Sequence, residues 1–178
     1  MIVIDMQTQF DNEPQRLLYE GLDCTVFLNP QMDDTERIQR AIVNDDDNLV
    51  LITGHGTPCG LLSVDWKDYI VNDAWADILR QKTVIGIWCY ASEFADRNNL
   101  HGFFTSMFVS NLNEAIENHV ARYATSDNIR EQMELFCRTI NCFMRGNIPM
   151  DEWVGNLQQM CCDLQFVRFN YEALSYFE

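Results

Sequence analysis

Two residues of the sequence combine the side chains and the spacing that nucleophilic catalysis requires. His55 stands between two glycines after the apolar run LVLIT, and Cys89 follows the apolar run TVIGIW. The two positions are 34 residues apart, which is enough chain for one crossover connection between neighbouring strands. An imidazole beside a thiol can take its proton and so favour the thiolate, the reactive form of cysteine.

The residues around this pair indicate how the chemistry would be assisted. Gly56 would leave its backbone N–H open to an incoming carbonyl oxygen, and the N–H of Cys89 would complete an oxyanion hole. A helix expected over Ala91–Asn98 begins just after Cys89, so its positive end should lower the pKa of the thiol. We therefore expect Cys89 to be alkylated faster near neutral pH than the other thiols, and His55→Ala to slow that reaction.

A sheet is needed to bring the pair together, and the sequence predicts one. Short continuous apolar runs alternate with helical patterns, which is typical of a parallel sheet covered by helices on both faces. Ligands of such sheets bind outside the carboxyl ends of the strands, so we expect the strands before His55 and Cys89 to be adjacent and parallel. The expected strands are Met1–Asp5, Cys24–Leu28, Leu49–Thr53, Thr83–Trp88 and Phe103–Val109, with a minor strand or hairpin in Trp66–Asn72.

Helical patterns dominate the second half of the chain. The expected helices are Glu13–Tyr19, Asp33–Val43, Ala74–Arg80, Ala91–Asn98, Asn111–Tyr123, Asp127–Arg145 and Asp151–Cys162. Gln165–Phe169 reads as a last strand or as the start of a tail helix. The sequence thus predicts one α/β domain over residues 1–178, a three-layer sandwich with a mostly parallel central sheet, in which residues 111–178 form a mainly helical C-terminal part.

Length and charge exclude several classes of function. The 178 residues fit one domain, and the net charge of −15 would repel phosphate backbones and anionic membrane surfaces, so we expect neither nucleic acid nor a membrane as partner. The longest apolar runs are shorter than the roughly 20 residues of a membrane span. The N-terminus lacks the basic start of a signal peptide, and an odd number of cysteines favours reduced thiols, so a cytoplasmic protein is expected.

The remaining cysteines give little sign of a metal or cofactor. Cys59 lies in a loop near His55 and is an alternative nucleophile or redox thiol, although it lacks a following helix. The other cysteines lack CxxC spacing, and core packing explains them better than a zinc site. Neither glycine-rich phosphate-binding motif occurs in the sequence. We expect no metal and no organic cofactor.

An apolar strand that ends in His-Gly is followed by an apolar strand that ends in Cys. This pattern resembles the caspase–legumain–gingipain group of cysteine peptidases. The resemblance covers about Leu49–Ser92. It implies a caspase-like fold and a peptide or protein substrate. It also implies that His55 is the catalytic histidine, that Cys89 is the nucleophile, and that Gly56 lends an oxyanion N–H.

Acidic residues flank the expected site. Asp65, Glu93 and Asp96 are candidates for binding a basic substrate side chain, although many of the 27 acidic residues must lie on the surface in any case. A different class of function stays open beside the enzyme. A noncatalytic α/β interaction module would keep this fold and use its acidic surface to bind a partner.

A second resemblance begins at the N-terminus. Val3-Ile4-Asp5-Met6-Gln7, with Phe10 following, is similar to the opening of the isochorismatase-like cysteine hydrolases. In that family an aspartate, a lysine and a cysteine form a triad, and Asp5, Lys67 and Cys89 occur here in that order. A cysteine hydrolase of this second type is therefore a further alternative.

Overall fold

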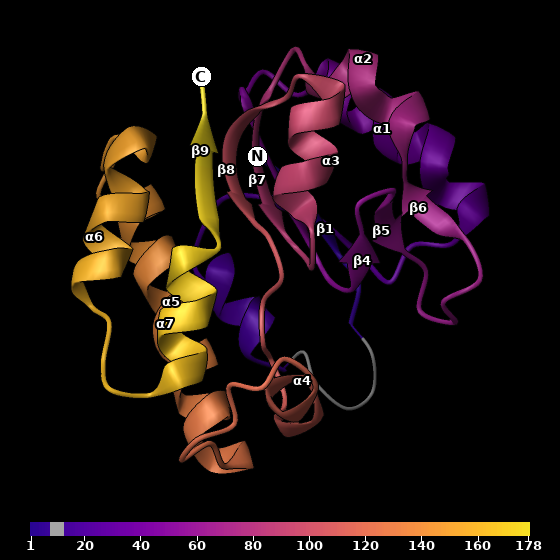
Figure 1. The fold of residues 1–178 in the computed structure, drawn as a ribbon. Coiled ribbons are helices and arrows are strands. Elements are labelled where there is room, and N and C mark those ends of the chain that lie inside the picture. The colour runs from indigo at the N-terminus through magenta and orange to yellow at the C-terminus, as the bar shows by residue number, and fades with distance from the viewer. Residues whose placement is uncertain (8–12) are drawn as a thin grey trace.

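A six-stranded sheet forms the centre of the protein (Figure 1), whose structure, a computed structural model, describes residues 1–7 and 13–178. The strand order is β2-β1-β3-β7-β8-β9. Neighbours from β2 to β8 pair in parallel, and β9 is antiparallel to β8. The strands are β1 (Ile2–Asp5), β2 (Thr25–Leu28), β3 (Leu49–Thr53), β7 (Thr83–Ile87), β8 (His101–Thr105) and β9 (Leu174–Phe177). The predicted α/β class with a mostly parallel sheet is confirmed.

Helices cover both faces of this sheet. The α-helices are α1 (Thr35–Asn44), α2 (Ala76–Leu79), α3 (Ala91–Asn98), α4 (Leu112–Glu117), α5 (Ser126–Arg145), α6 (Trp153–Gln159) and α7 (Gln165–Glu172). The 3-10 helices are η1 (Glu13–Leu18), η2 (Met32–Asp34), η3 (Asp73–Trp75) and η4 (Met150–Glu152). Val3 and Leu51 face α5, α6 and α7, whereas Ile4 and Ile52 face α1, α2 and α3. Apolar residues on both faces of each strand thus produce the three layers seen in Figure 1.

A small antiparallel sheet is inserted between β3 and β7. It consists of β4 (Gly56–Thr57), β5 (Gly60–Leu62) and β6 (Tyr69–Val71), in that order. It begins immediately after His55, at the end of β3. The expected minor strand in Trp66–Asn72 therefore corresponds to β6, and the hairpin lies beside the carboxyl ends of the parallel strands (Figure 1).

The C-terminal part departs from the expected bounds at β8 and α4, and the segment from Gln165 follows the helical one of its two expected alternatives. Strand β8 ends at Thr105, before the expected Val109, and the N–H of Ser106 donates one more hydrogen bond to the carbonyl of Ala173 beside β9. Helix α4 ends at Glu117, and the chain turns at His119 with a φ of 58°. The segment that starts at Gln165 is helix α7, and the chain then returns to the edge of the sheet as β9.

Two glycines give a matched test of this packing. Gly102 on β8 has a φ of 134°, and a Cβ there would lie 1.9 Å from the carbonyl oxygen of Val84 on β7. We expect Gly102→Ala to lower the free energy of unfolding by about 3 kcal/mol or more. Gly155 lies in α6 with nothing within 4 Å of its added Cβ, so Gly155→Ala should raise stability by about 0.5–1 kcal/mol. Urea unfolding measures the change in the free energy of unfolding for both variants. Equal changes in the two variants would contradict the close contact between Gly102 and Val84.

Candidate functional site

The carboxyl ends of β3 and β7 lie side by side. Thr53, the last residue of β3, is in register with Ile87, the last residue of β7, in a parallel pair. The N–H of Gly54 donates to the carbonyl of Ile87 at 3.1 Å and extends this pairing past the strands. The prediction that the strands before His55 and Cys89 are adjacent and parallel is therefore confirmed.

His55 and Cys89 line one narrow pocket at this edge. The pocket has about 20 Å³ of space for water-sized molecules, which is room for about one water. Its lining residues come from η1, β7, α5 and the loops after the strands: Gln15, Gly54, His55, Ile87, Trp88, Cys89, Phe108, Ser110 and Met133. The structure thus brings the two predicted catalytic residues to a common pocket.

Two of the residues that line this pocket carry a buried polar atom with no hydrogen-bond partner among residues 1–7 and 13–178. These atoms are Nε2 of His55 and Oε1 of Gln15, whose side chain is 6% exposed. A buried polar atom without a partner costs about 1–3 kcal/mol, so such atoms mark places where a ligand or water can contribute a bond. Sequence reasoning missed Gln15, because its place at the pocket depends on how η1 packs against the sheet and no sequence motif marks it.

Cys89 is more deeply buried than the sequence suggested. Its thiol donates a hydrogen bond to the carbonyl of Phe108, with an Sγ–O distance of 3.6 Å. Burial raises the pKa of this thiol to about 11, and the carboxylates of Glu114 and Glu93 act in the same direction. At neutral pH only about one molecule in ten thousand then carries the thiolate.

This result corrects the expectation of a lowered pKa and of rapid alkylation near neutral pH. Desolvation by burial is the largest cause of the raised pKa of Cys89. Tyr90, with a left-handed φ of 69°, separates Cys89 from α3. In the part of the chain that the structure describes, His55 makes no side-chain hydrogen bond to the thiol. The imidazole stacks instead on Trp66, with ring centroids 4.9 Å apart.

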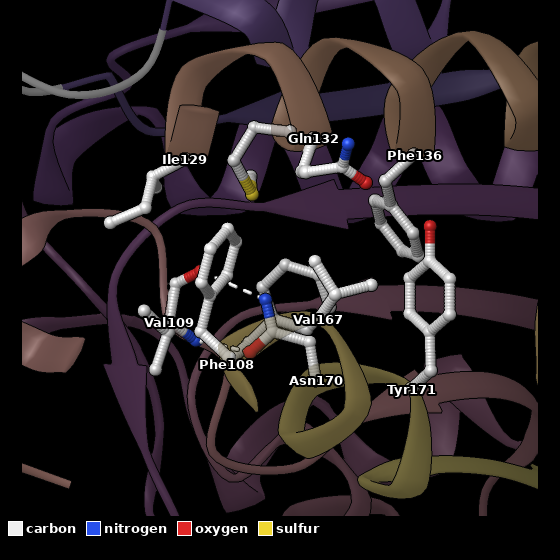
Figure 2. Close-up of a pocket in the computed structure, with 10 residues that line it drawn as sticks. Phe108, Val109, Ile129, Gln132, Phe136, Val167, Asn170 and Tyr171 are labelled. Carbon is white, nitrogen blue, oxygen red and sulfur yellow. Dashed lines mark hydrogen bonds between the residues drawn. The ribbon is translucent and has the colours of Figure 1, made fainter. Parts of the chain in front are cut away.

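A short segment after β8 holds the carbonyl that binds the thiol. The side chain of Asn170 on α7 accepts a hydrogen bond from the N–H of Val109 (2.7 Å) and donates one to its carbonyl (2.9 Å). Figure 2 shows this clamp beside a second cavity of about 10 Å³ between the segment, α5 and α7. Phe108 and Met133 line both spaces and therefore separate them.

Of the two expected oxyanion donors, Cys89 lines the pocket and Gly56 does not. In the described residues, the backbone N–H of Cys89 makes no hydrogen bond. Gly56 starts β4, where a Cβ would lie 2.1 Å from Cδ1 of Trp88. Only glycine therefore fits at position 56, for a steric reason that the sequence did not reveal.

The three acidic candidates for substrate binding are all exposed; Asp65 lies in the connection between β5 and β6, and the other two lie three residues apart on α3. Asp65 is bound to Lys67 at 2.9 Å and to Ser63, and these hydrogen bonds lower the pKa of its carboxyl to about 2. Glu93 on α3 accepts hydrogen bonds from the hydroxyls of Ser92 and Ser106. Asp96 is also on α3. None of the three lines the pocket of His55 and Cys89.

The alternative triad of Asp5, Lys67 and Cys89 is not brought together. Asp5 is fully buried at the end of β1, where it accepts hydrogen bonds from Tyr19 (2.7 Å) and Gln7 (2.6 Å). Lys67 is exposed and paired with Asp65. Phe10, the last residue of that resemblance, lies outside the described residues.

The other cysteines are also present as free thiols. All seven cysteines are free, and Cys59 is exposed in the turn between β4 and β5. Within residues 1–7 and 13–178, no three histidine, cysteine or acidic side chains are grouped as they would be around a metal ion. None of the described helices is long and apolar enough to span a membrane.

Comparisons with known proteins add no assignment to this geometry. No protein-family model matches the chain, and no curated protein matches its sequence. The residues and their contacts therefore carry the functional argument.

The raised pKa of Cys89 predicts a distinctive pH dependence. Because the thiolate reacts, the rate of alkylation by iodoacetamide should rise about tenfold per pH unit from 7 to 10 and level off near the thiol pKa of about 11. Peptide mapping after timed labelling measures this rate at Cys89. In the urea-unfolded chain the same rate should level off near pH 8.5, the ordinary pKa of cysteine. A plateau below pH 8 in the folded protein would contradict the burial of the thiol.

Proposed function

We propose that the protein is a cysteine-dependent hydrolase, most simply a peptidase like those of the caspase–legumain–gingipain group. The observation that carries the proposal is that His55 and Cys89 leave neighbouring parallel strands and line one pocket. The unpartnered Nε2 of His55 and the unused N–H of Cys89 support it, because proton transfer and oxyanion binding need such groups.

The raised thiol pKa favours general-base catalysis over a preformed ion pair. Cys89 starts as a thiol, and His55 takes its proton as the sulfur attacks the substrate carbonyl carbon. The C–S bond forms, and the backbone N–H groups of Cys89 and Gly56 hold the oxyanion. The C–N bond then breaks, and His55 returns the proton to the leaving amine. Water, with His55 as base, hydrolyses the thioester and restores the thiol.

Substrate binding must first release the thiol from its resting contact. The Cys89 thiol donates its proton to the carbonyl of Phe108 in this contact. A substrate that enters the pocket displaces this contact and aligns thiol with imidazole. Catalytic hydrogen bonds often tighten in this way only when substrate is bound.

A noncatalytic interaction module is the second candidate. Two observations favour it: the buried, protonated thiol, and the lack of a His55–Cys89 hydrogen bond among the described residues. Its acidic surface, from a net charge of −15, would bind a basic partner. A labelling experiment with a substrate-like electrophile separates the two candidates.

A tripeptidyl acyloxymethyl ketone should label Cys89 in a reaction that depends on His55. We expect His55→Ala to lower the maximal labelling rate by about 10²-fold or more, since general-base assistance contributes on this scale. His101→Ala is the matched control, because His101 lies on β8 and does not line the pocket. Mass spectrometry of the labelled peptide gives the rates. Equal rates for the wild type and His55→Ala would favour the interaction module.

The size of the pocket predicts the substrate residue that precedes the cleaved bond. With about 20 Å³ available, Gly, Ala and Ser should be cleaved in preference to larger residues. Met133→Ala enlarges the pocket and should improve cleavage after Val or Leu by about tenfold relative to Ala. Met144→Ala, on the same helix but outside the pocket, should leave the order of preference among these substrate residues unchanged. Cleavage of a peptide series measures this, and a preference for large residues in the wild type would contradict it.

A further inference from the structure

We propose that Trp66 is a positioning residue that holds the imidazole of His55 ready for proton transfer. This inference rests on the proposed function and names a residue that neither the chemistry nor the sequence pattern identified. Trp66 lies in the connection between β5 and β6, eleven residues after His55.

Trp66 does not belong to the hydrophobic core. Its side chain is 57% exposed, and its backbone has a φ of 62°, a left-handed conformation that L-residues rarely adopt. An exposed indole in an unfavourable backbone conformation contributes little to folding. Strain of this kind persists where the surrounding structure enforces it, and it is common at functional sites.

A network of hydrogen bonds enforces the conformation of this turn. The N–H of Ser63 donates to the carbonyl of Asp68 (2.8 Å), and the N–H of Trp66 donates to the carbonyl of Ser63 (3.0 Å). The hydroxyl of Ser63 donates to Asp65 (2.7 Å) and accepts from the N–H of Asp68 (3.2 Å). Lys67 closes the network through Asp65. The turn therefore presents Trp66 in one fixed direction.

That direction is toward His55. The two rings have centroids 4.9 Å apart and planes inclined by 31°, so the indole contacts the imidazole in a tilted arrangement. A catalytic histidine is usually oriented by a hydrogen bond to a third side chain, most often a carboxylate. In the described residues the imidazole of His55 has no such bond, and the stack with Trp66 takes that role.

The stack suits a histidine that must both accept and return a proton. It restrains the plane of the ring without using Nε2, which has no hydrogen-bond partner among the described residues and can take and return the proton. The electron-rich face of an indole also attracts a cation, so it stabilises the imidazolium that forms during the reaction. Trp66 thus acts on the chemical step through His55, with no contact to the reacting atoms required.

Inactivation kinetics distinguish positioning from substrate binding. With Ala-Ala-Ala acyloxymethyl ketone, Trp66→Ala should lower the maximal inactivation rate of Cys89 by about tenfold, because small misplacements of a catalytic group have effects of this size. The half-saturating concentration should change by less than about twofold. Trp66→Phe retains an aromatic face and should keep the rate within about threefold of the wild type.

Two controls make the result specific to His55. Tyr123→Ala removes another exposed aromatic side chain with a left-handed backbone (71% exposed, φ 64°) that lies outside the pocket, and it should react like the wild type. In the His55→Ala background, Trp66→Ala should have no additional effect on the maximal rate. An equal effect of Trp66→Ala in both backgrounds overturns the proposal.

The stack can also be observed without any reaction. The chain has three histidines, so the ring protons of His55 can be assigned in an NMR spectrum by comparison with His55→Ala. Trp66→Ala should move these resonances downfield as the ring current of the indole is lost. Unmoved resonances overturn the proposal, because the two rings are then not stacked in solution.

The remaining outcomes separate the two proposals. A lower affinity for the probe with an unchanged maximal rate makes Trp66 a substrate contact and overturns the positioning role. If His55→Ala strongly lowers the maximal inactivation rate and Trp66→Ala leaves it unchanged, only the proposed role of Trp66 is overturned. If His55→Ala itself has no effect, the cysteine hydrolase proposal and the role of Trp66 are both wrong.

Discussion

The parallel pairing of β3 with β7 is the constraint on which the rest of the site depends. Thr53 and Ile87 end their strands in register, and the hydrogen bond from Gly54 to Ile87 carries the pairing one step further. A shift of one residue would turn the side chains after one strand to the other face of the sheet. In the observed register, His55 and Cys89 follow strand ends that lie side by side, and both residues line one pocket.

The same packing also restrains the reactivity of the thiol. Segment 106–110 is tied at Ser106 to Ala173 and at Val109 to Asn170, so the C-terminal α7 holds the carbonyl that binds Cys89 (Figure 2). Burial under this segment accounts for the raised pKa better than any nearby charge does. The helical second half of the chain is thus part of the site, although its residues carry no recognisable catalytic motif.

The sequence predicted those features that follow from local apolar periodicity. The strands before His55 and Cys89 and the long helix α5 could be predicted, because each carries a continuous or helical apolar pattern. The raised pKa of Cys89 could not be predicted, because it depends on the carbonyl of Phe108 and on α7, which are distant in sequence. Gln15 and Trp66 reach the site only through tertiary packing and a side-chain network, neither of which leaves a periodic signal.

Buried polar groups give the clearest indication that this edge of the sheet serves a purpose beyond folding. At the end of β1, Oδ2 of Asp5 accepts hydrogen bonds from Tyr19 and Gln7, while its Oδ1 is buried without a partner among the described residues. At the end of β3, Nε2 of His55 is likewise buried without such a partner, and His55 lines one pocket together with Gln15, whose Oε1 is also unpartnered. Two such atoms would each destabilise a purely structural interior. Their placement beside Cys89 is explained most simply if the pocket receives a polar group, and the carbonyl of a scissile bond is such a group.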